Sequence, residues 1–171
     1  MTDDLEALYQ STYTSLVRFL FRKVWDLDRA EDLAQEVFVR AMHHQPEKPR
    51  AWVFAVAANL ARDEARAAVR RKRHLTLLTS DPAGSPAPEP DAQDLVEHDE
   101  RLASVHRALA TLTARDQEVL LLWDAGLSYP EISLRTGLAL GAVGTTLARA
   151  RKRLVEAHDR MTHERIDAAH S

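Results

Sequence analysis

One stretch of the sequence, residues 113–154, constrains the fold most because it contains signals for both ends of successive helices. Thr113 and Asp116 have the spacing of a capping box. The residues after them form an apolar face at helical spacing, and Gly126 then supplies a stop signal. The members of that face are Val119, Leu120 and Trp123. This pattern predicts a helix between about residues 113 and 126.

Two more helices are predicted directly after the first. Ser128 can cap a helix that has Pro130 in its first turn and Glu131 three residues after the cap. Gly137 supplies a left-handed stop, so this helix has about two turns. The third helix begins at about Gly141, and its apolar face consists of Val143, Leu147, Ala150 and Leu154.

The third helix has a basic outer face. Successive helical residues lie about 100° apart, so four side chains point away from the apolar face: Thr145, Ala148, Arg149 and Lys152. Arg151 and Arg153 lie at its flanks, and these cations suit phosphates. The small or hydroxyl-bearing residues nearer the N-terminus suit base edges: Ala142, Thr145 and Thr146. The pattern predicts a DNA-reading helix-turn-helix; the alternative is a short helical hairpin with a solvated basic end.

Composition favours an all-α fold of two small helical domains. Hydrophobic residues make up 45% of the chain, while aromatics reach only 6% and there are 5 glycines. Because there is no cysteine, the sequence excludes disulfides and thiolate metal sites, and we expect no metal and no cofactor. No apolar run approaches the roughly 18 residues of a membrane span, and the acidic start lacks signal-peptide features. We therefore expect a cytoplasmic protein without membrane insertion.

The net charge of −3 conceals two basic blocks, residues 62–73 and 149–153. The segment between them, residues 74–100, has no Lys or Arg but has seven acids and four prolines. Residues 79–91 have a composition that buries too little apolar surface to form an ordered structure. We therefore predict a flexible acidic linker at 76–98, between domains 1–75 and 99–158. For the tail, 159–171, a frayed end is the default, and an extended helix or a regulator-binding segment is the alternative.

The N-terminal domain begins with a helix whose core face follows the i, i+3, i+4 rule: Tyr13, Leu16, Val17, Leu20, Phe21 and Val24. A second helix, from Ala30 to about Met42, has Leu33, Val37 and Ala41 inward. Its outer face is formed by Asp32, Gln35, Glu36 and Arg40. Such a face is either solvated or a protein-docking surface.

A long third helix is predicted from about Arg50 through Leu60, extending toward Arg73. Six of its side chains fall within a band about 80° wide beside the apolar stripe: Trp52, Asn59, Arg62, Arg66, Arg70 and Arg73. An indole can stack on a base, an amide can bond its edge, and arginines can hold phosphates, as in single-strand binders. The alternative is a solvated helix with a half-buried Trp.

Three motifs in this order resemble the extracytoplasmic-function sigma factors of bacterial RNA polymerase. AEDLAQEVFVRA is similar to a region 2 helix of that family, and PRAWVFAVAANLARDEAR is similar to its promoter-melting segment. LTARDQEVLLLWDAGLSYPEIS followed by ARARKRL is similar to region 4. The resemblance implies an initiation factor without catalytic residues that binds core RNA polymerase and recognises and melts promoter DNA.

The resemblance also implies roles for the surfaces. Asp32, Gln35 and Glu36 match the surface that binds the clamp helices of the polymerase's largest subunit. Asn59 matches a position near which a flipped minus-ten base is held, with Trp52 and Arg62 on the same side. The resemblance leads us to expect a helix break near Asn59, and the three side chains remain neighbours with or without it. The resemblance assigns recognition of the minus-thirty-five element to Arg149 and its basic neighbours. It also implies an anti-sigma factor that wedges between the two domains.

Two positions depart from the family pattern. Gly144 and Thr146 stand where the family usually has a Lys and an Arg early in the recognition helix. We therefore expect atypical minus-thirty-five contacts that depend more on the remaining cations, Arg149, Arg151, Lys152 and Arg153.

Three other interpretations remain open at this stage. The chain could be a stand-alone helix-turn-helix regulator that does not dock on polymerase. A metal-dependent hydrolase using His43 and His44 is disfavoured, because adjacent helical side chains point about 100° apart and no third ligand is implied. A protein-only adaptor would leave the band of Trp52, Asn59 and the four arginines unexplained.

Overall fold

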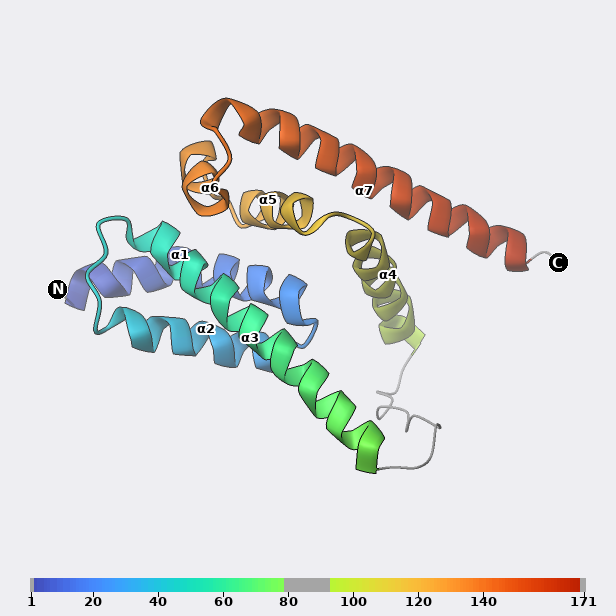
Figure 1. Ribbon diagram of the computed structural model, residues 1–171, viewed down its shortest axis with the longest axis horizontal. Coiled ribbons are helices and arrows are strands. Elements are labelled where there is room, and N and C mark those ends of the chain that lie inside the picture. The colour runs from blue at the N-terminus through green and yellow to red at the C-terminus, as the bar shows by residue number, and fades with distance from the viewer. Residues whose placement is uncertain (1, 79–92, 170–171) are drawn as a thin grey trace. The chain divides into compact units, whose positions relative to one another are not determined.

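The computed structural model describes residues 2–78 and 93–169, and within these ranges the chain forms seven helices and no strand (Figure 1). The helices are α1 (Thr2–Val24), α2 (Leu27–Ala41), α3 (Pro49–Leu78), α4 (Gln93–Ala110), α5 (Ala114–Asp124), α6 (Tyr129–Thr136) and α7 (Leu140–Ala169). Two compact units are present: Met1–Pro86 with Asp124–Leu127, and Ala87–Trp123 with Ser128–Ser171. The predicted all-α class is confirmed.

The first unit is built from α1, α2 and α3, each of which packs against the other two. Leu16 and Leu20 of the predicted α1 stripe are fully buried, and so is Phe19, which the stripe did not include. The Phe19 ring meets Phe54 of α3 edge to face, with centroids 5.4 Å apart. Val37 of α2 is also fully buried in this core.

Helix α2 begins three residues earlier than predicted because Asp26 caps it. The Asp26 carboxylate accepts a hydrogen bond of 2.9 Å from the Arg29 amide. Helix α3 starts with Pro49, a residue favoured in the first turn. It continues without interruption to Leu78, so the expected break near Asn59 is wrong for this structure.

In the second unit the predicted boundaries of α5 and α6 are confirmed by their caps. The Thr113 hydroxyl accepts a hydrogen bond of 3.2 Å from the Asp116 amide. Ser128 and Glu131 form a complete capping box at the start of α6. Gly126 and Gly137 have φ angles of 83° and 73°, the left-handed conformation that glycine adopts with little strain.

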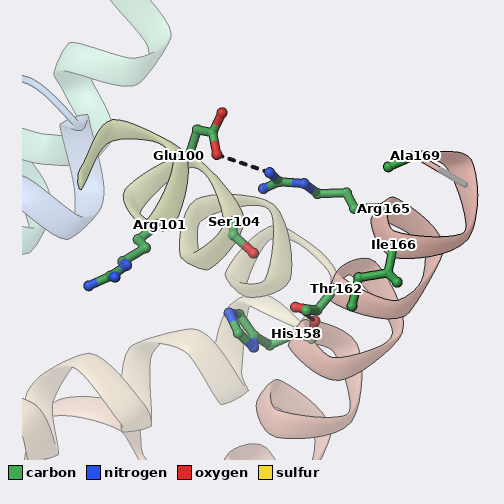
Figure 2. Close-up of a pocket in the computed structure, with 8 residues that line it drawn as sticks. All are labelled: Glu100, Arg101, Ser104, His158, Thr162, Arg165, Ile166 and Ala169. Atoms are coloured by element: carbon green, nitrogen blue, oxygen red, sulfur yellow. Dashed lines mark hydrogen bonds and ion pairs between the residues drawn. The ribbon is translucent and has the colours of Figure 1, made fainter. Parts of the chain in front are cut away.

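Helix α4 was not predicted, and for the tail the structure shows the alternative of an extended last helix. Residues 76–78 and 93–98, assigned to the linker, are helical, whereas residues 79–92 lie outside the described part of the chain. The default of a frayed tail is also wrong, because α7 extends to Ala169 and packs against α4. An ion pair of 2.9 Å between Glu100 and Arg165 spans the groove between these helices (Figure 2). Each helix gives the other's apolar residues a partner, which explains why both are ordered.

Within the described ranges, no helix combines the length and the apolar character needed to cross a membrane.

Candidate nucleic-acid interface

The predicted band on α3 is formed in the structure as one row along a continuous helix. Its amide and its four arginines are all exposed: Asn59, Arg62, Arg66, Arg70 and Arg73. Trp52 is half-buried at the N-terminal end of the row. On the apolar stripe beside this row, Val53, Ala57 and Leu60 are buried in the unit's core, while Val56 is only partly buried. The band therefore presents an indole, an amide and guanidinium groups to solvent, as predicted.

The Trp52 indole has a neighbour that the sequence analysis did not pair with it. His44, in the connection between α2 and α3, stacks on it with ring centroids 5.2 Å apart and planes 19° from parallel. His44 is exposed, and one face of the indole is thereby covered. Helical periodicity carries no signal for this contact, because His44 lies in a loop.

Glu64 joins α2 to α3 and lies on the side of α3 away from the band, roughly 160° around the helix from its centre. One carboxylate oxygen accepts from Arg29 at 2.6 Å and the other accepts from Arg71 at 3.1 Å. The hydrogen bond from Arg29, followed by that from Arg71, lowers the pKa of the Glu64 carboxyl, although partial burial opposes the shift. Arg71 therefore pairs within the unit, whereas Arg70 and Arg73 belong to the exposed row.

The acidic face of α2 is exposed as predicted. The side chains of Asp32 and Glu36 are 66% and 46% exposed, and Gln35 is exposed between them. Arg40 pairs with Glu36 at 2.5 Å along the same helix. Beneath this face, Leu33 and Val37 are buried, so packing fixes the orientation of the acidic surface.

In the second unit, α7 presents its predicted outer face. Thr145, Ala148, Arg149 and Lys152 are exposed, while Val143, Leu147 and Ala150 are buried. Ala142 is partly exposed. The prediction for Thr146 is wrong: its side chain is only 3% exposed. Thr146 lies about 60° from Val143 and about 40° from Ala150 around the helix, so it faces the core.

Among the basic residues of the outer face, Arg149 donates to the Thr146 hydroxyl at 3.5 Å, and the other three also have partners within the unit. Arg153 donates to the buried carboxylate of Asp116 at 2.6 Å, which joins α7 to the start of α5. Lys152 lies 3.9 Å from Glu156. The guanidinium of Arg151 lies 4.3 Å from the centroid of the Trp123 ring. The expectation that Trp123 packs in the apolar face of α5 is wrong, since it is 38% exposed and contacts this arginine.

The structure also shows what lies beside Gly144, one of the departures from the family pattern. A Cβ atom at this position would lie 3.4 Å from Cε2 of Tyr129. Tyr129 is the first residue of α6 and is 44% exposed. Its ring lies against the position where a longer side chain would begin. This contact of Tyr129 was not predicted. Its only signal in the sequence is that position 144 has no side chain.

Comparison with known proteins gives the same two-part organisation. Residues 8–71 match the family model of Sigma-70 region 2, and residues 102–154 match that of Sigma-70, region 4.

Two curated relatives align over most of the chain. It is 28% identical over 158 residues to the RNA polymerase sigma factor YlaC of Bacillus subtilis (strain 168), which covers 89% of this chain and 90% of that protein. It is 33% identical over 151 residues to the ECF RNA polymerase sigma factor SigL of Mycobacterium tuberculosis (strain H37Rv), covering 84% of this chain and 82% of that protein.

A solved structure has a similar fold. The sigma factor RpoE in the co-crystal with the anti-sigma factor NepR from Bartonella quintana superposes with a TM-score of 0.62 at 22% identity. The match covers 92% of this chain and 97% of that chain. At 22% identity, this superposition indicates a shared fold.

Proposed function

The chain belongs to the extracytoplasmic-function sigma factors of RNA polymerase, and we propose that three of its surfaces carry out promoter-specific transcription initiation. One surface binds the core enzyme, one melts the minus-ten region, and one recognises the minus-thirty-five element. The observation that carries this proposal is the exposed row of Trp52, Asn59 and four arginines on the continuous α3 helix. A stand-alone regulator would bind DNA through its helix-turn-helix and would not need such a row in a separate unit.

Core binding is assigned to the acidic face of α2. Asp32, Gln35 and Glu36 are exposed on a helix whose opposite face is fixed in the core. A rigid acidic surface of this kind suits a partner that presents cationic side chains, because complementary charge orients the encounter. By resemblance, that partner is the clamp helices of the largest polymerase subunit.

Promoter melting is assigned to the α3 band. Unstacking a base costs a few kcal/mol, which binding offsets when the unpaired base gains stacking and hydrogen bonds. The partly exposed Trp52 indole offers stacking, and the Asn59 amide offers hydrogen bonds to a base edge. Arg62, Arg66, Arg70 and Arg73 continue the row and are assigned to backbone phosphates. The band makes and breaks no bond, so catalysis belongs to the polymerase.

Recognition of the minus-thirty-five element is assigned to the outer face of α7. Ala142 and Thr145 lie in its first two turns, where helix-turn-helix proteins contact bases. Arg149, Arg151, Lys152 and Arg153 are assigned to phosphates and flanking base edges. Thr146 is withdrawn from the contacting set because it is buried.

An anti-sigma factor is proposed as a further partner. The supporting observation is the shared fold with RpoE, which was solved in complex with the anti-sigma factor NepR. We place the chain's action in the cytoplasm because polymerase and promoter DNA are there.

The test is run-off transcription by purified core polymerase, with and without this chain, on a pooled promoter library from its own genome. Discrete start sites that appear only with the chain support the proposal. Arg62→Ala should abolish most of these transcripts, whereas Arg18→Ala, which removes an exposed cation from α1, should leave them unchanged. If no start site appears and the chain does not co-elute with core enzyme, the stand-alone regulator becomes the better account.

A further inference from the structure

The outer face of α7 carries no charge in the turns that precede Arg149. It is formed there by Gly144, Thr145 and Ala148, which we call the apolar strip. Thr145 and Ala148 are exposed, and Gly144 is partly exposed. The strip lies in the N-terminal part of the helix, which is the part that contacts base edges in helix-turn-helix complexes.

The Thr145 hydroxyl is already engaged within the helix. It donates to the carbonyl oxygen of Ala142 at 3.1 Å. Because its hydrogen is used in this bond, the γ-methyl is the part of the exposed side chain without a polar commitment. Ala148 adds a second methyl group on the same outer face. The strip therefore presents two methyl groups and no free side-chain donor.

Tyr129 extends this apolar surface. Its ring carbon Cε2 lies 3.4 Å from the Cβ position of Gly144, and its hydroxyl lies 3.8 Å from the same position. Gly144 lies at one edge of the strip, so the ring borders the strip at that position. A Cβ at Gly144 would meet the ring at ordinary van der Waals distance, so the ring lines the position where a longer side chain would begin.

Of the nearby cations, Arg149 lies beside the strip, where its guanidinium donates to the Thr146 hydroxyl at 3.5 Å. Arg151 lies over Trp123 and Arg153 pairs with Asp116, both farther toward the C-terminus. Arg151 and Arg153 suit backbone phosphates, whereas the strip faces the edges of the bases. Thymine is the base that displays a methyl group in the major groove, and Ala and Thr methyl groups contact it favourably.

We infer that Thr145 and Ala148 read thymine in the minus-thirty-five element through its C5-methyl group, with the Tyr129 ring closing one side of the contact. This inference rests on the proposed function and specifies its DNA sequence: at least one thymine must face α7. Where Lys and Arg at positions 144 and 146 would recognise bases through polar contacts, this chain recognises a base through an apolar contact.

The experiment replaces each minus-thirty-five thymine by deoxyuridine, which removes the methyl group and keeps base pairing. Binding of the promoter by the complete holoenzyme is measured by competition, together with transcript yield from the unmodified promoter. Loss of one buried methyl contact should weaken binding about fourfold. The effect should be confined to the one or two thymines that face Thr145 and Ala148.

Matched variants separate the methyl group from the hydroxyl. Thr145→Ser removes the methyl and should abolish discrimination between thymine and uracil at its position. Thr145→Val keeps a methyl and removes the hydroxyl, so discrimination should persist. A merely structural role for Thr145 would change binding to both promoters equally in either variant.

The inference is overturned if active holoenzyme binds thymine and uracil promoters equally, if the element has no thymine facing α7, or if Ser retains discrimination and Val loses it. Those outcomes leave the transcripts intact and so leave the proposed function standing. Absence of transcripts from the unmodified promoter would instead reject the proposed function itself.

Discussion

Acidic side chains that pair with arginines hold the two binding surfaces in place. Glu64 fixes Arg29 and Arg71 in the first unit, and Asp116 fixes Arg153 in the second. Glu118 similarly lies 3.2 Å from Arg135, which joins α5 to α6. The Glu64–Arg29 and Asp116–Arg153 pairs join α3 and α7, which carry assigned binding residues, to neighbouring helices, so their loss should affect stability before it affects specificity.

Glu64→Gln should lower the stability of the first unit at neutral pH by about 1 kcal/mol, because two partly exposed ion pairs are lost. In the folded protein the pKa of Glu64 is lowered from its unfolded value, which is about 4.3. The ionised Glu64 therefore stabilises the fold fully above the unfolded pKa, and this stabilisation is lost as the pH falls through the folded pKa. Urea unfolding followed by Trp25 and Trp52 fluorescence, in a Trp123→Phe background, measures this.

The difference in unfolding free energy between wild type and Glu64→Gln should therefore decrease as the pH is lowered below about 4.3. A constant difference across that range would show that the network does not depend on the Glu64 charge.

At the Asp116–Arg153 pair the two partners should differ in cost. Arg153→Ala leaves a buried carboxylate without its cation and should cost about 2 kcal/mol, whereas Asp116→Asn leaves an exposed guanidinium and should cost about 1 kcal/mol. Thermal unfolding of both variants compares them directly. The opposite order would indicate that Asp116 is compensated by groups other than Arg153.

Residue positions that depend on local geometry were predictable, and those that depend on distant partners were not. The caps at Thr113 and Ser128 use atoms three residues away, so sequence spacing was enough. The burial of Thr146 follows from its place between Val143 and Ala150 around the helix and was overlooked, whereas the stacking of His44 on Trp52 depends on tertiary packing. Trp123 was misplaced because its amphipathic ring is equally suited to a core and to contact with Arg151.

At the scale of whole elements, α6 and α7 owe their orientation to the turn between them. Gly137 closes α6 with φ of 73°, and no atom lies within 4 Å of a Cβ added there. Any cost of a side chain at this position is therefore backbone strain. Gly141 offers a matched control, because it lies inside α7 and also has nothing within 4 Å of an added Cβ.

Gly137→Ala should lower the stability of the second unit by about 1 kcal/mol because L-residues pay this cost in the left-handed region. Gly141→Ala should instead raise stability by roughly 0.5–1 kcal/mol, since alanine favours the helix. Circular dichroism melting of both variants checks the opposite signs. Equal and small shifts would mean that the turn tolerates a different conformation.

The helices that were missed show the limit of sequence pattern. Helix α4 is predicted poorly because an acidic segment precedes it, and the C-terminal part of α7 is predominantly polar. Their order depends on mutual packing and on the Glu100–Arg165 pair, whose members are 65 residues apart in sequence (Figure 2). Such long-range contacts leave no local periodicity to detect.

For the whole molecule, charge predicts how binding is divided between this chain and polymerase. The net charge is −3 despite the basic rows on α3 and α7. Without a large positive excess, the isolated chain lacks the counterion release that drives tight DNA binding. In a gel-shift at physiological salt, the chain alone should bind promoter DNA weakly and the holoenzyme tightly; tight binding by the isolated chain would contradict this division.

The central claim is that the α3 band opens promoter DNA within the polymerase complex, and fluorescence of 2-aminopurine placed at the minus-ten element tests it most directly. The account predicts a fluorescence rise that requires both core polymerase and this chain, and that is largely lost with Asn59→Ala but retained with Arg18→Ala. A rise of normal size with Asn59→Ala, or no rise with a holoenzyme that binds the promoter, would contradict it.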